Sequence, residues 1–386
     1  MKIPQEFDTI RPWEPEDLPE VYERLLANEQ FKKVLAFLYP QVSFDMIAQK
    51  LKLCHTNLDF QKAFCYDFVH GILKKAGKGC EIDTSSIDNT RNYTFISNHR
   101  DIVLDSAILD VLLIDNGFQT TCEIAIGDNL LSLPWVKDLV RVNKAFIVER
   151  ALSMRQMLMS SKRLSDYMHF AIKEKNENVW IAQREGRAKD SNDRTQKSIL
   201  QMMAMGGEGS IIDRLKQLHL VPLSISYEYD PCDYLKAAEY QSKRDVEGWK
   251  KGPTDDLVSM QTGIFGYKGH VHYHAAACLD EYLDSLDPEM PKQDIFNKVA
   301  AHIDHEIHSN YKMYAGNYVA LDLLEGTTEY ADHYTAEQKA QFEQYVAGQL
   351  AKIDLPNKDE AYLRERLLTM YANPLRNYLA AKSSKV

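Results

Sequence analysis

A histidine and two aspartates follow an apolar run in the segment ISNHRDIVLD, residues 96–105. If the run is a strand that ends at Ser97, the next helix starts just after Asp101, which would be its N-cap. Helical side chains tilt toward the N-terminus, so Asp105, one turn into that helix, points back to the loop that carries His99. A carboxylate there accepts the imidazole N–H, fixes the tautomer and leaves the other ring nitrogen free to take a proton. The spacing therefore predicts a general base, although a surface or capping role fits the same two residues.

A base of this kind needs a hydroxyl to act on. A hydroxyl that loses its proton to the imidazole can attack a carbonyl, as in Ser-His-Asp enzymes. The chain has no G-x-S-x-G motif that would present an internal serine. We therefore expect the hydroxyl to belong to the substrate.

A second polar group follows a later apolar run, in the segment WIAQREGRAKDSNDRTQKS. Strand-to-loop crossings at the carboxyl edge of a sheet are where ligands bind in open α/β folds. Arginine offers a planar fork for phosphate oxygens, and lysine offers a point charge. In a chain with a net charge of -10 this concentration of cations predicts an anionic ligand; a solvated loop is the alternative, most of all for the last two cations. The charged residues around Gly186 are Arg184, Glu185, Arg187, Lys189, Arg194 and Lys197.

Three regions with different patterns must position these residues. Apolar residues at spacings of three and four predict helices up to about residue 75. Between residues 93 and 280 short apolar runs alternate with helical patterns, which predicts an α/β fold with a central, mostly parallel sheet flanked by helices. Helical patterns return after Pro291. We therefore predict a helical N-terminal region over 1–88, an α/β domain over 89–285 and a helical C-terminal region over 286–386.

Composition argues against several classes of protein. A net charge of -10 disfavours nucleic acid as the main partner. The first 28 residues lack the apolar run of a secretory signal, and no window approaches the ~18 apolar residues of a transmembrane helix. Six cysteines without C-x-x-C spacing fit a reducing, cytoplasmic compartment. Any contact with a membrane is therefore expected to be peripheral.

Four short blocks stand in the same order as the motifs of a known family. Over roughly residues 90–230 the chain resembles the glycerol-3-phosphate and 1-acylglycerol-3-phosphate acyltransferases, of the lysophospholipid acyltransferase superfamily. That family has a His-x4-Asp motif, a G-x-x-F-x-x-R-like motif, an F-P-E-G-T-R-like motif and a V/I-P-hydrophobic motif. The counterparts here are NHRDIVLD with His99 and Asp105, NKAFIVER with Phe146 and Arg150, AQREGRAK with Glu185, Gly186 and Arg187, and LVPLSI with Val221 and Pro222.

The blocks depart from the family pattern at several positions. His99 and Asp105 are spaced as His-x5-Asp, a longer spacing that is found in a looser branch of haemolysin-like and ornithine-lipid acyltransferases. Asn143 stands where glycine is usual, Arg184 replaces proline and Arg187 replaces threonine. These departures bear more on the identity of the acceptor than on the type of reaction.

The resemblance implies a fold and a set of site residues. It implies the acyltransferase fold for the α/β domain, with His99 and Asp105 as the catalytic pair and with no metal or other cofactor. By similarity to the soluble, plastid-type enzymes of the family, the two basic residues after Gly186 would bind phosphate. Arg100 would contact the donor's phosphates or lie on the surface. The substrate-binding residues that the resemblance implies are Arg150, Glu185, Gly186, Arg187 and Lys189.

The implied reaction moves a fatty acyl group to a hydroxyl of glycerol 3-phosphate or of a lysophosphatidate-like acceptor in membrane lipid synthesis. The acyl donor would be a co-substrate, a thioester of acyl carrier protein or CoA. The resemblance also implies a cytoplasmic enzyme, peripheral on the inner face of the cell membrane. Its expected partners are the acyl donor, a glycerolipid precursor and the membrane surface, and not nucleic acid.

Three other functions fit parts of the sequence. An amino-acid lipid of the ornithine or glycine type fits as acceptor, since arginines hold carboxylates as well as phosphates. Two histidine clusters, GHVHYHA and HIDHEIH, fit a zinc-dependent hydrolase, although neither has the H-E-x-x-H pattern. The departures also fit a non-catalytic protein that binds acyl lipids or acyl carriers. The methionines of 154–159 and 202–205 suit either an acyl chain or ordinary core packing.

Overall fold

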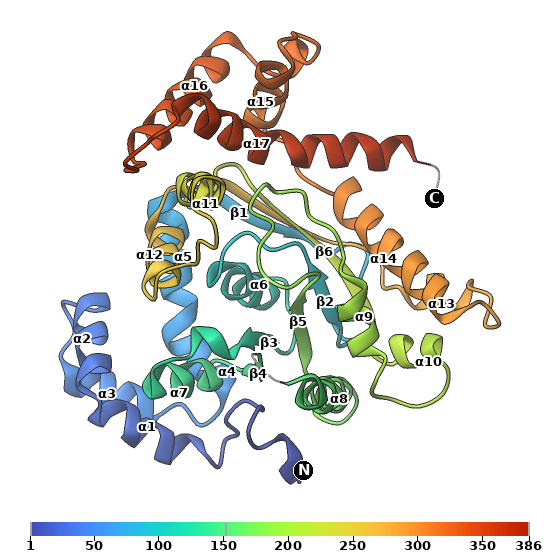
Figure 1. Ribbon diagram of the computed structural model, residues 1–386. Coiled ribbons are helices and arrows are strands. Elements are labelled where there is room, and N and C mark those ends of the chain that lie inside the picture. The colour runs from blue at the N-terminus through green and yellow to red at the C-terminus, as the bar shows by residue number, and fades with distance from the viewer. Residues whose placement is uncertain (1, 151–152, 385–386) are drawn as a thin grey trace.

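A seven-stranded sheet runs through the described residues, 2–150 and 153–384, of the computed structural model. The strand order is β1-β7-β6-β2-β5-β3-β4, and every neighbouring pair is parallel except β6 and β7 (Figure 1). The mostly parallel sheet flanked by helices confirms the predicted fold class. The strands are β1 (Gly77–Asp83), β2 (Thr94–Ser97), β3 (Cys122–Gly127), β4 (Ala145–Val148), β5 (Asn178–Ala182), β6 (Leu220–Tyr227) and β7 (Gly269–Ala275).

Both faces of the sheet are covered by helices, so its central strands are almost wholly buried. Every residue of β2 is buried, as expected for a parallel strand with helices on both sides. Successive side chains point to opposite faces. Phe95 therefore packs in the cluster that includes α6 (Leu104–Asp115), whereas Ile96 packs in the cluster that includes α8 (Met154–Lys173).

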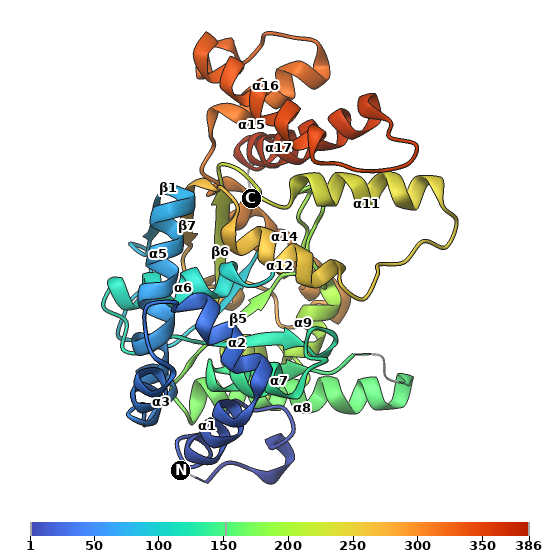
Figure 2. The same cartoon turned by 90° about the vertical axis from the view of Figure 1, so that its left-hand side faces the viewer.

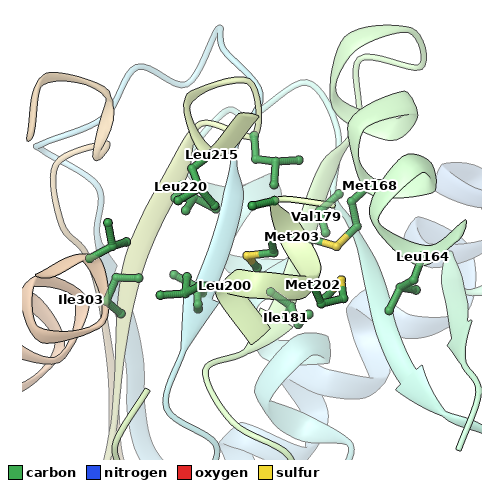
Figure 3. Packing of buried hydrophobic residues seen from close by; sticks show 14 of the residues in the cluster. Leu164, Met168, Val179, Ile181, Leu200, Met202, Met203, Leu215, Leu220 and Ile303 are labelled. Atoms are coloured by element: carbon green, nitrogen blue, oxygen red, sulfur yellow. The ribbon is translucent and has the colours of Figure 1, made fainter. Parts of the chain in front are cut away.

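The methionines divide into two groups with different surroundings. Met202 and Met203, on α9 (Lys197–Met203), are buried in the second of these clusters, between the sheet and the neighbouring helices (Figure 3). Core packing accounts for them. Met154, Met157 and Met159, at the start of α8, are 88%, 56% and 65% exposed. The first group therefore belongs to the core, and the second lies on the surface.

Helices before and after the sheet region form their own clusters. The N-terminal helices α1 to α3 pack around Leu25 and Leu51 and against α7, while α15 to α17 gather around Phe342 and Leu367 at the top of Figure 1. The remaining helices are α1 (Leu18–Ala27), α2 (Glu29–Leu38), α3 (Phe44–Lys52), α4 (Asn57–Phe60), α5 (Tyr66–Ala76), α7 (Pro134–Val142), α10 (Ile211–Lys216), α11 (Asp233–Asp245), α12 (Asp255–Phe265), α13 (Asp280–Asp284), α14 (Lys292–Ser309), α15 (Ala315–Glu325), α16 (Ala336–Ala351) and α17 (Glu360–Ser383). Short 3₁₀ or π turns are Gln5–Phe7, Gln61–Cys65, Asp128–Leu130 and Ala331–His333.

The sheet has one strand that the sequence pattern did not predict. β1 lies inside the region 1–88, for which only helices were expected, and pairs with β7 at the edge of the sheet. Its sequence, GKGCEID, is rich in glycine and charge and has a weak inside–outside alternation. It forms because β7 offers a free edge for pairing, which local pattern does not reveal. The three domain boundaries stay a prediction.

No helix within the described ranges combines the length and the apolar character needed to cross a bilayer.

Candidate active site

His99 and Asp105 meet at the carboxyl end of β2. The His99 Nδ1 lies 2.7 Å from Asp105 Oδ2, and the same oxygen accepts the backbone N–H groups of Arg100 (2.6 Å) and Asp101 (3.0 Å). Asp105 is fully buried, in the first turn of α6, where the helix dipole favours a negative charge. Because three donors converge on one oxygen, the carboxylate is held in place to orient the imidazole.

The orientation of the imidazole leaves one ring nitrogen for chemistry. A carboxylate can only accept, so Nδ1 carries the proton and Nε2 is the basic nitrogen. Nε2 makes no hydrogen bond to the part of the chain that the structure describes, and the side chain keeps 14% exposure. The ring edge packs against Trp180 of β5 at 5.5 Å between centroids. The arrangement is that of a general base open to an incoming hydroxyl.

Asp101 is not the N-cap residue that its position predicted, because Val103 occupies that position, but its side chain still bonds the start of the helix. Its Oδ1 accepts the backbone N–H groups of Val103 (2.9 Å) and Leu104 (2.8 Å). The helix itself begins at Leu104, later than expected. Burial and the neighbouring Asp105 raise the pKa of Asp101. Its other oxygen packs against Gly263 of α12, where a Cβ atom would collide with it. Asp101 therefore supports the loop and does not face His99.

Arg100 is buried, which contradicts the surface position that was one of its two expected roles. It is 6% exposed, and its Nη2 donates to Asp193 and to the Tyr311 hydroxyl. A buried guanidinium requires such a partner. Arg100 thus joins the loop after β2 to the loop after β5, and a contact with the donor's phosphates stays a prediction.

The cations after β5 line a cleft of about 390 Å³. Four of its side chains are cationic and two are acidic, which leaves an excess of two positive charges when all are ionised. Arg184 Nε and Arg187 Nη1 are buried atoms without a hydrogen-bond partner among the described residues. Such atoms suit an anionic ligand that supplies oxygens. The lining residues are Arg184, Arg187, Lys189, Asp190, Asn192, Glu239, Tyr240 and Lys243.

Helix α11 completes the cleft from beyond the motif-bearing segment. Glu239 forms ion pairs with Lys189 and with Lys243, the latter at 2.8 Å. Burial, together with the nearby Lys243 and Lys251, lowers the pKa of Lys189 to about 7. The sequence analysis missed Glu239, Tyr240 and Lys243, because AAEYQSKR reads as an ordinary helix surface. No local signal marks these residues.

Three predicted substrate-binding residues lie outside the lining of the cleft. Arg150 pairs with Glu185 at 3.3 Å, and Glu185 is 67% exposed. Gly186 adopts a φ of 67°, in the left-handed region that glycine tolerates best. It therefore turns the loop between Glu185 and Arg187. The structure therefore places Arg187 and Lys189 together in the cleft and sets Arg150 and Glu185 beside each other.

The catalytic pair and the cleft lie at the same edge of the sheet. Strands β2 and β5 are parallel neighbours with Ser97 opposite Ala182, and the Gln183 N–H donates to the Ser97 carbonyl at 2.7 Å. The loops with His99 and Arg187 therefore leave the sheet side by side. The positive charge of Arg187 also acts to lower the pKa of Asp101, although burial raises that pKa by more.

The two histidine clusters do not converge on a metal site in the part of the chain that the structure describes. His272 and His274 pair with Glu81 (3.1 Å) and Asp83 (3.4 Å) on the less buried face of β7. His308 is buried and contacts the Asp193 carbonyl at 2.9 Å. His272 and His274 therefore form ion pairs at the surface of the sheet, and His308 packs in the interior.

Comparison with known proteins gives a family for part of the chain. Residues 81–226 match the model of the Acyltransferase family, a range that includes His99, Asp105 and the loop with Arg187. No curated protein matches the chain at a significant level. Among solved structures, the 1-acyl-sn-glycerophosphate (LPA) acyltransferase PlsC from Thermotoga maritima matches with 11% identity and a TM-score of 0.40, covering 74% of this chain and 96% of that chain. Residues 81–226 are therefore an acyltransferase domain, and the chain is an enzyme of the acyltransferase class.

Proposed function

We propose that the protein is an O-acyltransferase that moves a fatty acyl group from acyl carrier protein or a CoA thioester to a hydroxyl of glycerol 3-phosphate or a lysophosphatidate-like acceptor. One observation supports this most: the His99–Asp105 pair and a cationic cleft share the carboxyl edge of the sheet. A base for a hydroxyl beside a site for a phosphate is what such an acceptor requires.

The proposed reaction needs one base and no acyl-enzyme intermediate. The Nε2 of His99 takes the proton of the acceptor hydroxyl, and the oxygen attacks the thioester carbonyl. The tetrahedral intermediate collapses as the C–S bond breaks, and the imidazolium returns its proton to the departing thiolate. Asp105 stabilises the imidazolium while it exists, as the carboxylate does in Ser-His-Asp enzymes.

The cleft supplies the proposed acceptor contacts. Arg187 and Lys189 hold the phosphate, and the excess of two positive charges in the cleft suits a dianion better than the single charge of a carboxylate. We therefore favour a phosphate-bearing acceptor over an amino-acid lipid. Arg150 contacts the phosphate after it leaves its ion pair with Glu185. Glu185 positions the loop around Gly186.

We also propose a peripheral contact with the inner face of the cytoplasmic membrane. Helix α8 extends from the body of the molecule at its N-terminal end (Figure 2). The apolar side chains there are well exposed: Met154, Met157, Leu158 and Met159 are 88%, 56%, 64% and 65% accessible. Exposed apolar side chains in one helical segment are a common feature of membrane-contacting surfaces.

The test is acyl transfer by His99→Ala, with one labelled acyl donor and a panel of acceptors separated by thin-layer chromatography. We expect turnover to fall by roughly 100- to 10,000-fold, because the base is lost. His55→Ala, at an exposed histidine near α4, is the control and should keep wild-type turnover. The melting temperature of both variants should stay near that of the wild type.

The panel separates the remaining functions. Glycerol 3-phosphate, a lysophosphatidate and a hydroxyl-bearing amino-acid lipid are compared under the same conditions, with thiol release as a second readout. Wild-type turnover in His99→Ala would refute the mechanism. Binding of donor without thiol release would instead identify a non-catalytic protein, and activity that depends on added zinc after chelation would identify a metal hydrolase.

A further inference from the structure

Three side chains that can bind a metal ion meet at the opposite edge of the sheet. His219 stands directly before β6, Cys278 follows β7, and Asp280 opens α13. One ligand atom of each lies within 4.8 Å of the other two. The closest pair is His219 Nδ1 and Asp280 Oδ2, at 2.7 Å. The cluster therefore combines a nitrogen, a sulfur and an oxygen donor.

The sheet itself brings these residues together. Strands β6 and β7 are antiparallel, so the chain leaving β7 returns to the place where β6 begins. The Leu279 N–H donates to the Leu220 carbonyl at 2.8 Å, which sets Cys278 and Asp280 beside His219. In Figure 1 α13 lies on the far side of the sheet from α11, so the cluster is separate from the cleft. The proposed acyl transfer does not use it.

Two details of the cluster bear on whether it binds a ligand. Asp280 Oδ1 is buried and has no hydrogen-bond partner among the described residues. His219 has a φ of 46°, in the left-handed region that a residue with a side chain rarely adopts. An unused carboxylate oxygen and a strained histidine backbone are both consistent with a ligand-binding role.

The geometry points to a zinc-binding site formed by His219, Cys278 and Asp280. Imidazole, thiolate and carboxylate are the three side-chain ligands that Zn²⁺ takes in proteins, with water able to complete the tetrahedron. The side chains of His219 and Asp280 keep 35% and 23% exposure, so that water has access. On binding, the Cys278 thiol gives its proton to solvent and the thiolate coordinates the ion. The ion joins the start of β6 to the β7–α13 connection.

Arg91 is the cation that faces this cluster. Its Nη2 lies 3.3 Å from His219 Nδ1 and 3.4 Å from Asp280 Oδ2. The side chain is 49% exposed, so it can turn toward solvent when an ion binds. Because the guanidinium and the metal compete for the same carboxylate, removing Arg91 should strengthen zinc binding. An ion-pair cluster without a metal role predicts no such gain.

Zinc binding is measured on the full-length, reduced chain after chelator treatment, by competition with a chromogenic chelator. We expect one Zn²⁺ per chain. Loss of a residue that only supports a metal ligand weakens metal binding by roughly 10- to 100-fold. Cys278→Ser and Asp280→Asn remove ligands themselves, so we expect each to weaken zinc binding by more than that. Cys80→Ser is the matched control, because Cys80 is also a half-buried thiol but lies on β1, and it should bind zinc like the wild type.

Two further readouts make the test decisive. Arg91→Gln should bind zinc more tightly than the wild type, and Co²⁺ substitution should give a thiolate charge-transfer band that Cys278→Ser lacks. Circular dichroism confirms that each variant is folded. Zinc binding that is not stoichiometric, or that Cys278→Ser and Asp280→Asn leave unchanged, would overturn the proposal. Acyl transfer is assayed separately, so failure of one proposal is distinguishable from failure of the other.

Discussion

At the scale of single residues, the cleft contains one lysine, Lys189, that burial makes weakly basic. Lys189 sits among other cations and is partly desolvated, which lowers its pKa to about 7. It is therefore charged below that pH and neutral above it. A phosphate needs the charged form, so we expect the proposed contribution of Lys189 to acceptor binding to be present at low pH and to be lost as pH rises through about 7.

Lys189→Arg tests this directly, because a guanidinium stays charged at every working pH. We expect the KM for glycerol 3-phosphate to rise several-fold between pH 6 and 8 in the wild type and to change less in the variant. The protonation of the phosphate affects both enzymes alike, so the difference between the two profiles reports Lys189. Superimposable KM profiles would show that Lys189 does not contribute its charge to acceptor binding.

At the scale of elements, the junction of β2 and α6 depends on α12. Asp101 bonds the start of α6 through one carboxylate oxygen, and Gly263 lets the α12 backbone approach the other. The first turn of α6 in turn holds Asp105. Its Oδ2 accepts hydrogen bonds from the His99 ring N–H and from two backbone N–H groups. The catalytic geometry thus relies on a glycine that is distant in the sequence.

Gly263→Ala should therefore disturb the site without changing any polar residue. The added methyl group collides with the Asp101 carboxylate, and we expect a loss of about 1–3 kcal/mol in the free energy of unfolding with a fall in kcat. Gly71→Ala in α5 is the control: its Cβ meets nothing within 4 Å, so stability should stay equal or rise by about 0.4–1 kcal/mol. Thermal and urea unfolding measure the stability of both variants. Equal stability of the two would contradict the close contact between Gly263 and the Asp101 carboxylate.

At the scale of the whole molecule, apolar side chains gather on projecting segments. The start of α8 carries the exposed methionines, and Phe37 of α2 lies 6.2 Å from Phe265 of α12 between ring centroids, both exposed. Exposed apolar side chains gathered on one segment are a common feature of membrane-contacting surfaces, which makes the start of α8 the segment to test.

The double variant Met157→Gln, Leu158→Gln tests the α8 contact. Burying an apolar side chain contributes about 1.5–3 kcal/mol, so the fraction bound to anionic vesicles should fall at least about tenfold, as measured by sedimentation. Turnover with water-soluble glycerol 3-phosphate should be unchanged. The control is Leu53→Gln, at a 73% exposed residue directly after α3, and it should bind vesicles normally. Helix α3 lies away from α8 in Figures 1 and 2. Equal vesicle binding by all three proteins would refute the contact.

Short-range features followed from the sequence alone. The meeting of His99 and Asp105 needs only a strand, a short loop and one helical turn, so their spacing determined it. The alternation of strands and helices likewise predicted six strands of the sheet and its mostly parallel character. Such features depend on backbone periodicity and on side-chain direction within a few residues, which the sequence encodes locally.

Only the tertiary structure decided which distant residues face one another. Lys189 meets Glu239 fifty positions away, Arg100 is buried by Asp193 and Tyr311, and β1 exists because β7 offers it an edge. These contacts follow from packing whole elements together, and no local spacing encodes them. The sequence thus determined the base and the kind of fold, whereas the folded chain determined the composition of the cleft beside the base.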